Sequence, residues 1–241
     1  LEDKGVYDYD FVQASDKVTR PGQVKIADLD GNGFIDPGNF AVDDHGDLRI
    51  IGNQSPRYRY GVNLSARWNG IGLSVFLQGV GARDWYPGSD AGMFWGKYGR
   101  PFFALIPSIH NYTDDMYSAE RNNWDTAYWP RMTTYQSNGT KNWTRLLEIP
   151  NTRYIQSAAY LRVKNIQLDY SFPKHICSAI RLQGLKIYVN AENLFTFTPL
   201  HKYAPNFDPE GLSYDSDFAS AADGYTYPIL KSVTVGVNIT F

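Results

Sequence analysis

The fold is decided by residues 57–80, RYRYGVNLSARWNGIGLSVFLQGV, in which apolar or aromatic residues recur at every second position. Successive side chains of a β-strand point to opposite faces of a sheet, so this period is typical of a strand. Asn69-Gly70 interrupts the pattern, and this dipeptide favours the two-residue turn of a β-hairpin. The alternation then resumes at Ile71. The stretch therefore predicts antiparallel strands near 57–68 and 71–80, joined by a tight turn.

Three later segments show the same alternation. The segment YLRVKNIQLDYSF, from Tyr160 to Phe172, changes parity near Lys164 and Asn165. One extra residue there would keep a single face apolar, so we expect a β-bulge. The other two segments are LKIYVNAENLF, from residue 185, and the final SVTVGVNITF. Together they predict strands near 158–172, 184–196 and 229–241.

The expected strands are about 10 to 13 residues long, whereas strands of globular sheets have a mode of about 5 or 6. A tilted strand that crosses a bilayer needs about 9 to 11 residues, with apolar side chains toward lipid. Short turns alternate with long connections, over 80–158 and 198–228, as in outer-membrane barrels with long extracellular loops. We therefore expect an all-β chain of transmembrane strands. A water-soluble β-sandwich, whose strands also alternate, stays open as an alternative.

Composition limits the other classes of protein. The chain has 241 residues and a formal net charge of −2, which suits one large domain and disfavours a nucleic-acid partner. Cys177 is the single cysteine, so an internal disulfide is excluded and a metal site would use oxygen ligands. No apolar run approaches the roughly 18 residues of a membrane-spanning helix.

Five segments, taken in order, resemble the C-terminal part of SusC-like (RagA/SusC) TonB-dependent outer-membrane transporters of the Bacteroidetes. They are GQVKIADLDGNGFID, RIIGNQSPRYRYGVNLSARWNGIGLSVFLQGVGARDWY, YIQSAAYLRVKNIQLDYSFPK, LKIYVNAENLFTFT and SVTVGVNITF. The resemblance covers nearly the whole chain. It implies a barrel of about 22 antiparallel strands around a plug, an architecture found in outer-membrane transporters.

The same resemblance implies a function and partners. Such a transporter imports oligosaccharides or peptides across the bacterial outer membrane, is energised by the TonB complex, and works with a SusD-like surface lipoprotein. Neither a plug pattern nor a TonB box nor a signal peptide is recognisable, and five or six strands cannot close a lumen of that size. An open strand edge is not tolerated in lipid. We therefore expect residues 1–241 to be a C-terminal fragment whose partners include the remainder of the barrel, the plug and membrane lipid.

The stretch KIADLDGNGFID, from Lys25 to Asp36, places oxygen-bearing side chains as a calcium loop does. The expected ligands are Asp28, Asp30, Asn32, the Phe34 carbonyl and Asp36. Position twelve of such a loop, normally glutamate, is Asn39, so Asp43, Asp44 or Asp47 would have to substitute. The other interpretation is a turn whose carboxylates bind their own backbone. The sequence predicts a structural Ca²⁺ ion rather than a calcium sensor.

The long 80–158 connection is rich in tryptophan and tyrosine, whose flat faces can stack on sugars or contact peptide side chains. The candidate substrate-binding residues are Trp85, Tyr86, Trp95, Trp124 and Trp129. Packing into a core of the loop itself is the competing explanation for these rings. The sequence leaves glycan and peptide substrates equally open.

The four histidines are far apart in the sequence and form no recognisable catalytic pattern, so we expect no enzyme. The terminal Phe241 resembles the signal by which outer-membrane barrels are recognised for assembly. Two classes of function remain. One is a segment of an outer-membrane importer, and the other is a soluble, calcium-stabilised glycan-binding β module.

Overall fold

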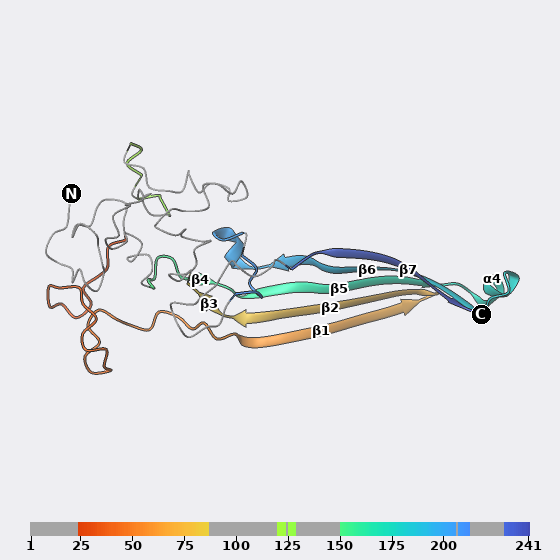
Figure 1. Cartoon of the computed structure of the whole chain (residues 1–241), viewed down its shortest axis with the longest axis horizontal. Helices are drawn as coiled ribbons and strands as arrows, with labels where there is room; N and C mark the ends of the chain where they lie inside the picture. The colour runs from red at the N-terminus through yellow and green to blue at the C-terminus, as the bar shows by residue number, and fades with distance from the viewer. Residues whose placement is uncertain (1–23, 87–119, 124, 129–149, 206, 213–228) are drawn as a thin grey trace, which may run out of the picture. The chain divides into compact units, whose positions relative to one another are not determined.

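The computed structural model describes residues 24–86, 120–123, 125–128, 150–205, 207–212 and 229–241. Its main feature is a five-stranded antiparallel sheet with the strand order β1-β2-β5-β6-β7 (Figure 1). The strands are β1 (Arg57–Trp68), β2 (Ile71–Ala82), β5 (Tyr160–Ser171), β6 (Gly184–Phe197) and β7 (Ser232–Thr240). A second, two-stranded sheet pairs β3 (Asp84–Trp85) with β4 (Gln156–Ser157).

The strands of the large sheet contain 12, 12, 12, 14 and 9 residues, well above the common length of about 5 or 6. β2 runs two residues beyond the expected end at 80, because Ala82 still pairs with Arg57. β7 begins at Ser232, three residues later than expected, where it meets Glu192 of β6. In the part of the chain that the structure describes, the regular elements are β-strands apart from short helices, as the alternation predicts.

The tight turn between β1 and β2 forms where Asn69-Gly70 predicts it. Asn69 has φ 46° and Gly70 has φ 84°, the positive values that a type I′ turn requires at both positions. The Gly70 carbonyl also accepts a hydrogen bond from Ser171 N at 2.8 Å. A Cβ at Gly70 would lie 2.6 Å from the carbonyl oxygen of Ser171, so glycine suits this position for two reasons.

The bulge expected in the third strand is confirmed. Pairing passes from Leu77↔Val163 to Phe76↔Asn165, so Lys164 is the extra residue against β2. The register between β5 and β6 shifts at the same place, where Val163 pairs with Phe195 and Asn165 with Glu192. Asn193 of β6 lies in this irregular region with φ 52°. Asparagine tolerates that conformation better than most residues, yet the sequence pattern did not indicate a second irregularity there.

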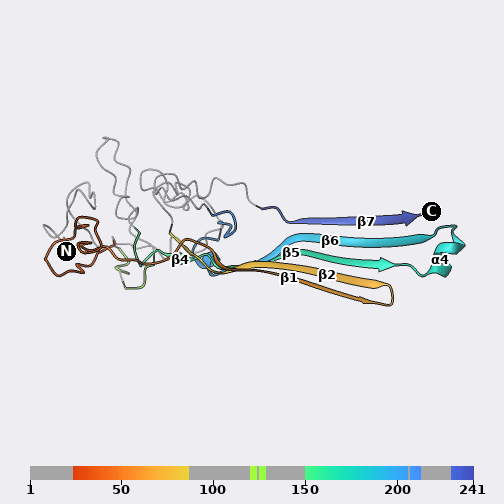
Figure 2. The same ribbon diagram turned by 90° about the horizontal axis from the view of Figure 1, so that it is seen from below.

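The short connections lie together at one end of the sheet. Figures 1 and 2 show the β1–β2 turn, helix α4 (Lys174–Ala179) and the C-terminus at that end. The connections from β2 to β5 and from β6 to β7 leave the opposite end and include residues outside the described ranges. Another short helix, η3 (Pro199–Lys202), follows β6. Among the described residues, no helix is long and apolar enough to span a bilayer.

One face of the large sheet exposes its apolar side chains. The exposed set includes Val62, Leu64, Ile71, Leu73, Leu168, Ile187, Val189, Val235 and Val237. The other face carries polar and charged residues. There Asp169 is buried and forms ion pairs with Arg67 of β1 at 3.2 Å and Lys186 of β6 at 3.3 Å. The two faces of the sheet thus have opposite chemical character.

The chain divides into two compact units. The sheet unit comprises Ser55–Arg83, Ser157–Leu200 and Pro228–Phe241, and the loop unit comprises Leu1–Gln54, Asp84–Gln156 and His201–Tyr227. In the described part of the loop unit, the buried apolar residues include Ile35, Trp85, Tyr86, Tyr154, Phe207 and Leu212. The loop unit therefore has an apolar core of its own.

Candidate functional site

The aspartate-rich stretch of the loop unit folds as a tight loop held by its own carboxylates. Asp28 accepts hydrogen bonds from Gly31 N at 2.6 Å and Gly33 N at 2.9 Å. Asp30 accepts one from Asn32 N at 2.9 Å. Gly31 and Gly33 have φ of 76° and 88°, which turns the backbone around these oxygens. Such side-chain to backbone bonds are typical of Asx turns.

Asp47 closes the loop from a distance in the sequence. Its Oδ1 accepts a hydrogen bond from Leu29 N at 2.5 Å, and its Oδ2 accepts one from Asp36 N at 2.9 Å. Asp47 lies 18 positions beyond Leu29 in the sequence. Its side chain is buried in the loop, and the residue is only 7% exposed. Asp47 was one of three residues that the sequence offered as a substitute for the missing glutamate, and the structure brings this one to the loop.

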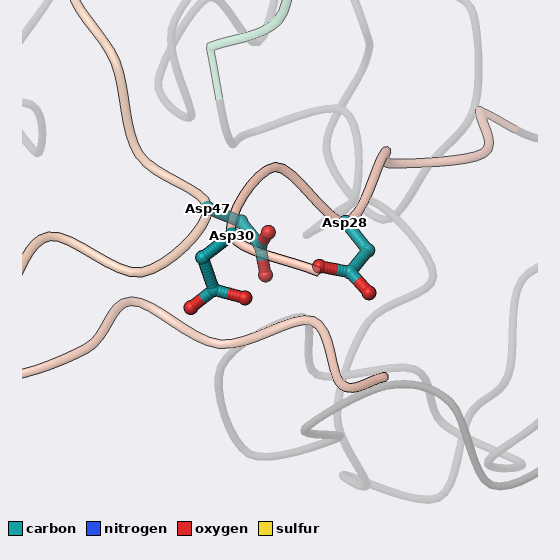
Figure 3. A group of neighbouring side chains, drawn as sticks. All are labelled: Asp28, Asp30 and Asp47. Atoms are coloured by element: carbon teal, nitrogen blue, oxygen red, sulfur yellow. The ribbon is translucent and has the colours of Figure 1, made fainter. Parts of the chain in front are cut away.

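Figure 3 shows the carboxylates of Asp28, Asp30 and Asp47 gathered on neighbouring turns of the chain. One oxygen from each lies within 4.8 Å of the others. The pKa of Asp28 is lowered mainly by the hydrogen bond donated by Gly33 N; desolvation opposes this effect, and the hydrogen bond donated by Gly31 N adds to it. An ionised carboxylate is the form that binds a cation.

The remaining residues predicted as metal ligands lie in the same loop and have protein partners. The Asn32 Oδ1 accepts a hydrogen bond from Phe34 N at 2.7 Å, and Asp36 Oδ1 accepts one from Gly38 N at 2.8 Å. Asn32 Nδ2 donates to Asp30 Oδ2 at 3.0 Å and to Asp36 Oδ2 at 3.4 Å. Carboxylate and amide oxygens match the preference of Ca²⁺, so the residues fit this ion. Whether they hold it stays a prediction.

Two of the five aromatic residues predicted to bind substrate are described, and both are buried. The Trp85 ring lies 5.2 Å from the ring of Phe207, measured between centroids. Tyr86 accepts a hydrogen bond at its hydroxyl from Asn151 Nδ2 at 2.8 Å. These contacts give both residues a place in the core of the loop unit. Three others, Trp95, Trp124 and Trp129, lie outside the described residues, and the binding role of all five stays a prediction.

A second aromatic group was missed by sequence analysis because its members are far apart in the chain. Tyr128 and Tyr203 stack with centroids 3.7 Å apart, and Tyr154 meets Tyr128 edge-on at 5.7 Å. The guanidinium of Arg153 lies 5.3 Å from the centroid of the Tyr128 ring. Burial raises the pKa of Tyr128 to about 12, and it also raises that of Tyr154. Both hydroxyls therefore stay neutral at physiological pH.

Phe241 follows the last strand and is highly exposed. The strand before it is fixed at its end, since Gln183 N donates to the Thr240 carbonyl at 2.8 Å. The predicted role of Phe241 as an assembly signal stays a prediction.

Comparison with known proteins gives a consistent family likeness, although no family model matches the chain. The TonB-dependent receptor P3 of Formosa agariphila is 27% identical over 227 residues, which are 92% of this chain and 19% of that receptor. The TonB-dependent receptor P39 of the same organism is 24% identical over 235 residues, which are 97% of this chain and 20% of the receptor. The chain thus spans about a fifth of the length of these relatives.

Parts of solved RagAB structures have the same fold as this chain. The RagAB peptide importer in the 'closed-closed' state matches with a TM-score of 0.52 and 20% identity, over 93% of this chain and 21% of that one. The RagAB peptide transporter matches with a TM-score of 0.50 and 18% identity, over 80% and 18%. The chain is therefore similar, along nearly all of its length, to part of a SusC/RagA-like TonB-dependent transporter, and its fold is that of a segment of the transporter's β-barrel.

Proposed function

We propose that this chain is the C-terminal part of an outer-membrane barrel that imports oligosaccharides or peptides in a TonB-dependent way. The observation that carries the proposal is the sheet of five long antiparallel strands with one exposed apolar face. Water would disfavour such a face, whereas acyl chains would cover it at little cost.

The dimensions of β1 support a membrane crossing. Tyr58 and Trp68 lie near its two ends, and each side chain is 74% exposed. Ten steps along a strand, at about 3.3 Å each, span roughly 33 Å, and a tilt of about 40° reduces the height to roughly 25 Å. That height equals the apolar band of outer-membrane barrels, about 25 Å, which aromatic girdles flank at both interfaces. Tyr58 and Trp68 would occupy those girdles.

The rest of the barrel would pair with the two outer strands. β1 and β7 form the edges of the described sheet, and unpaired backbone groups have no partner in lipid. We propose that about 17 further strands complete a barrel of about 22. In that barrel the polar face of this sheet, which includes Asp169 and Arg162, would line the lumen and face the plug.

The proposed partners and substrates follow from the likeness to RagAB. A SusD-like lipoprotein would cooperate with the barrel outside the membrane, and the TonB complex would act through other parts of the protein. The solved neighbours are named as peptide importers or transporters, which supports peptides. Oligosaccharides remain within the proposal. The similar proteins are named as receptors and transporters, so we propose transport without enzymatic activity.

We also propose that the loop unit holds a structural Ca²⁺ ion. Asp28, Asp30 and Asp47 would supply carboxylates, and the further predicted ligands are Asn32, the Phe34 carbonyl and Asp36. The ion would offset the repulsion among the three clustered carboxylates and so stabilise the loop.

Membrane fractionation of cells that produce the intact protein tests the main proposal. The protein should sediment with outer membranes, resist extraction by carbonate and salt, and require detergent for solubilisation. Recovery in the soluble fraction would contradict it and favour the soluble calcium-stabilised glycan-binding module instead.

A further inference from the structure

We propose that a pocket in the loop unit binds a small carboxylate that carries a short, branched aliphatic group. The pocket has a volume of about 210 Å³ and is lined by residues 24–27, 29, 47–49, 51 and 150–153. It lies beside the aspartate loop and shares Asp47 with it, but its other lining residues have different chemistry.

Most of the pocket lining is aliphatic. These residues are Val24, Ile26, Ala27, Leu29, Leu48, Ile51 and Pro150. Small-molecule sites usually combine such a lining with a few polar groups that fix the orientation of the ligand. The volume lies below the range of about 300–1,000 Å³ of sites for drug-sized ligands, so the occupant would be smaller. A branched group of four to six carbons, roughly the size of a leucine side chain, suits this space.

The polar lining favours an anion. Lys25, Arg49 and Arg153 contribute three cationic side chains, and all three residues are exposed. Asp47 is the one acidic residue among the described residues of the lining, and both of its oxygens accept backbone hydrogen bonds, from Leu29 N and Asp36 N. With three cationic side chains and one acidic side chain, these residues have a formal net charge of +2. A carboxylate forms its strongest hydrogen bonds with guanidinium groups, which can bind both of its oxygens.

Contacts within the protein hold Arg153 in position. Its Nη2 donates a hydrogen bond to the Ala127 carbonyl at 2.5 Å, and its guanidinium lies over the Tyr128 ring. A guanidinium has five N–H donors, so this bond leaves it further donor capacity. Because the side chain is already ordered, binding an anion costs less conformational entropy.

The lining disfavours a sugar. Among the described residues that line it there is no aromatic ring, the usual platform on which a sugar stacks, and the apolar residues would leave most hydroxyls without partners. A carboxylate with an aliphatic tail satisfies both the cations and the apolar surface. That chemistry occurs at the C-terminus of a peptide and in a free branched acid.

Binding of three probes to the intact protein, purified in detergent, tests the proposal by calorimetry or ligand-observed NMR. The probes are N-acetyl-leucine, which mimics a peptide C-terminus, 4-methylpentanoate, which is a free acid, and N-acetyl-leucinamide, which lacks the carboxylate. We expect at least one acid to bind, and the amide to bind at least about tenfold more weakly because it loses the charge-assisted hydrogen bonds. The tighter acid identifies the source of the ligand.

Variants localise the binding. Arg49→Gln should raise the Kd of the acid about tenfold, and Arg153→Gln should do the same, whereas Arg121→Gln, at an exposed site outside the pocket, should leave it unchanged. Arg49 makes the decisive variant because Arg153 also contacts the core of the loop unit. Equal affinity for acid and amide, an unchanged Kd in Arg49→Gln, or no binding of either acid at millimolar concentration would overturn the proposal. None of these results bears on whether the protein is an outer-membrane importer, which fractionation decides.

Discussion

The side chain of Tyr188 in β6 lies over Gly236 of β7, its directly paired cross-strand neighbour. A Cβ at Gly236 would overlap the Tyr188 ring. Tyr60 and Gly79 form a second pair of this kind between β1 and β2, and the Tyr60 hydroxyl also donates to the Tyr160 carbonyl at 3.2 Å. In both pairs an aromatic ring covers the glycine on the neighbouring strand. The ring shields the glycine backbone, which has no side chain of its own to cover it.

These pairs predict different costs for added methyl groups. A Cβ at Gly79 would overlap the backbone oxygen of Tyr160 as well as the Tyr60 ring, and backbone yields less than a side chain. Gly79→Ala should therefore lower the free energy of unfolding by about 1–3 kcal/mol. Gly236→Ala should cost less, because the outer end of Tyr188 can move. The free energy of unfolding of both variants is measured by urea titration of the intact protein in detergent. The folded fraction is determined from the mobility of unheated samples on a gel.

Gly61→Ala is the matched control for these glycine substitutions. Gly61 also lies in a strand, but the nearest atom to its Cβ would be Cε2 of Phe76 at 3.4 Å. The Gly61→Ala protein should be as stable as the parent or more so. An equal loss of stability in all three variants would show that the aromatic contacts are not the cause.

Lipid exposure of the apolar face predicts an asymmetric tolerance to charge. Val75 of β2 pairs with Leu64 and Ile166, near the middle of the strands. Val75→Arg should cost about 2–4 kcal/mol of stability if this position lies at mid-bilayer, since the guanidinium would lose its water. Ser74→Arg, on the opposite face, should be mild, because Ser74 is exposed and pairs with the uncharged Ser65 and Gln167. The free energy of unfolding of each variant is measured by folding the protein into lipid vesicles over a series of denaturant concentrations. A similar loss of stability in both variants would argue against the orientation in which the apolar face contacts lipid.

The buried carboxylate of Asp169 predicts a local electrostatic effect. Asp169→Asn removes both ion pairs, with Arg67 and Lys186, and should cost about 1–3 kcal/mol. Arg67→Gln should cost less, because the Arg67 side chain is 60% exposed and Asp169 keeps its ion pair with Lys186. A double-mutant cycle in the same unfolding assay gives the coupling energy. A coupling energy near zero for both pairs would show that the network contributes nothing to stability.

Removal of single carboxylates tests the calcium proposal. Asp28→Asn and Asp47→Asn should each weaken binding of Ca²⁺ or the luminescent probe Tb³⁺ by at least about tenfold, because each removes a charged oxygen ligand. Asp43→Asn is the control, since Asp43 is exposed in the same loop but lies outside the cluster. Unchanged Tb³⁺ luminescence in Asp28→Asn would favour the interpretation as a self-bonded turn.

The lowered pKa of Asp28 predicts how the loop responds to acid. Its pKa in the folded protein lies below the ordinary value of 3.8, so its stabilising effect is complete above that value and is lost as pH falls through the folded pKa. Hydrogen exchange of the peptide containing Gly33 should therefore stay slow, after correction for intrinsic rates, down to about pH 4 and accelerate below it. Asp28→Asn should remove this acid transition. An identical transition in that variant would assign it to another group.

Local sequence signals predicted the sheet well, because each depends on neighbouring residues. Asn69-Gly70 predicted the position of the β1–β2 hairpin, and the parity change beside Lys164 predicted the bulge in β5. The second irregularity, at Asn193, leaves no comparable trace, because it depends on how β6 meets the bulge in β5. Contacts between distant residues were also out of reach. Nothing local distinguishes Asp47 from Asp43 or Asp44, and the stack of Tyr128 on Tyr203 joins residues from separate loops.

The two hydrogen bonds that Asp47 accepts from Leu29 and Asp36 have a consequence for any ion bound nearby. They hold the loop in one shape through contacts within the protein, with its carboxylates close together. A ligand shifts a conformational equilibrium only by as much as its affinities for the two conformations differ. A loop that protein contacts hold in one shape offers little such difference. A calcium ion bound here would stabilise the loop in this conformation and would not switch it to another, as a calcium sensor does.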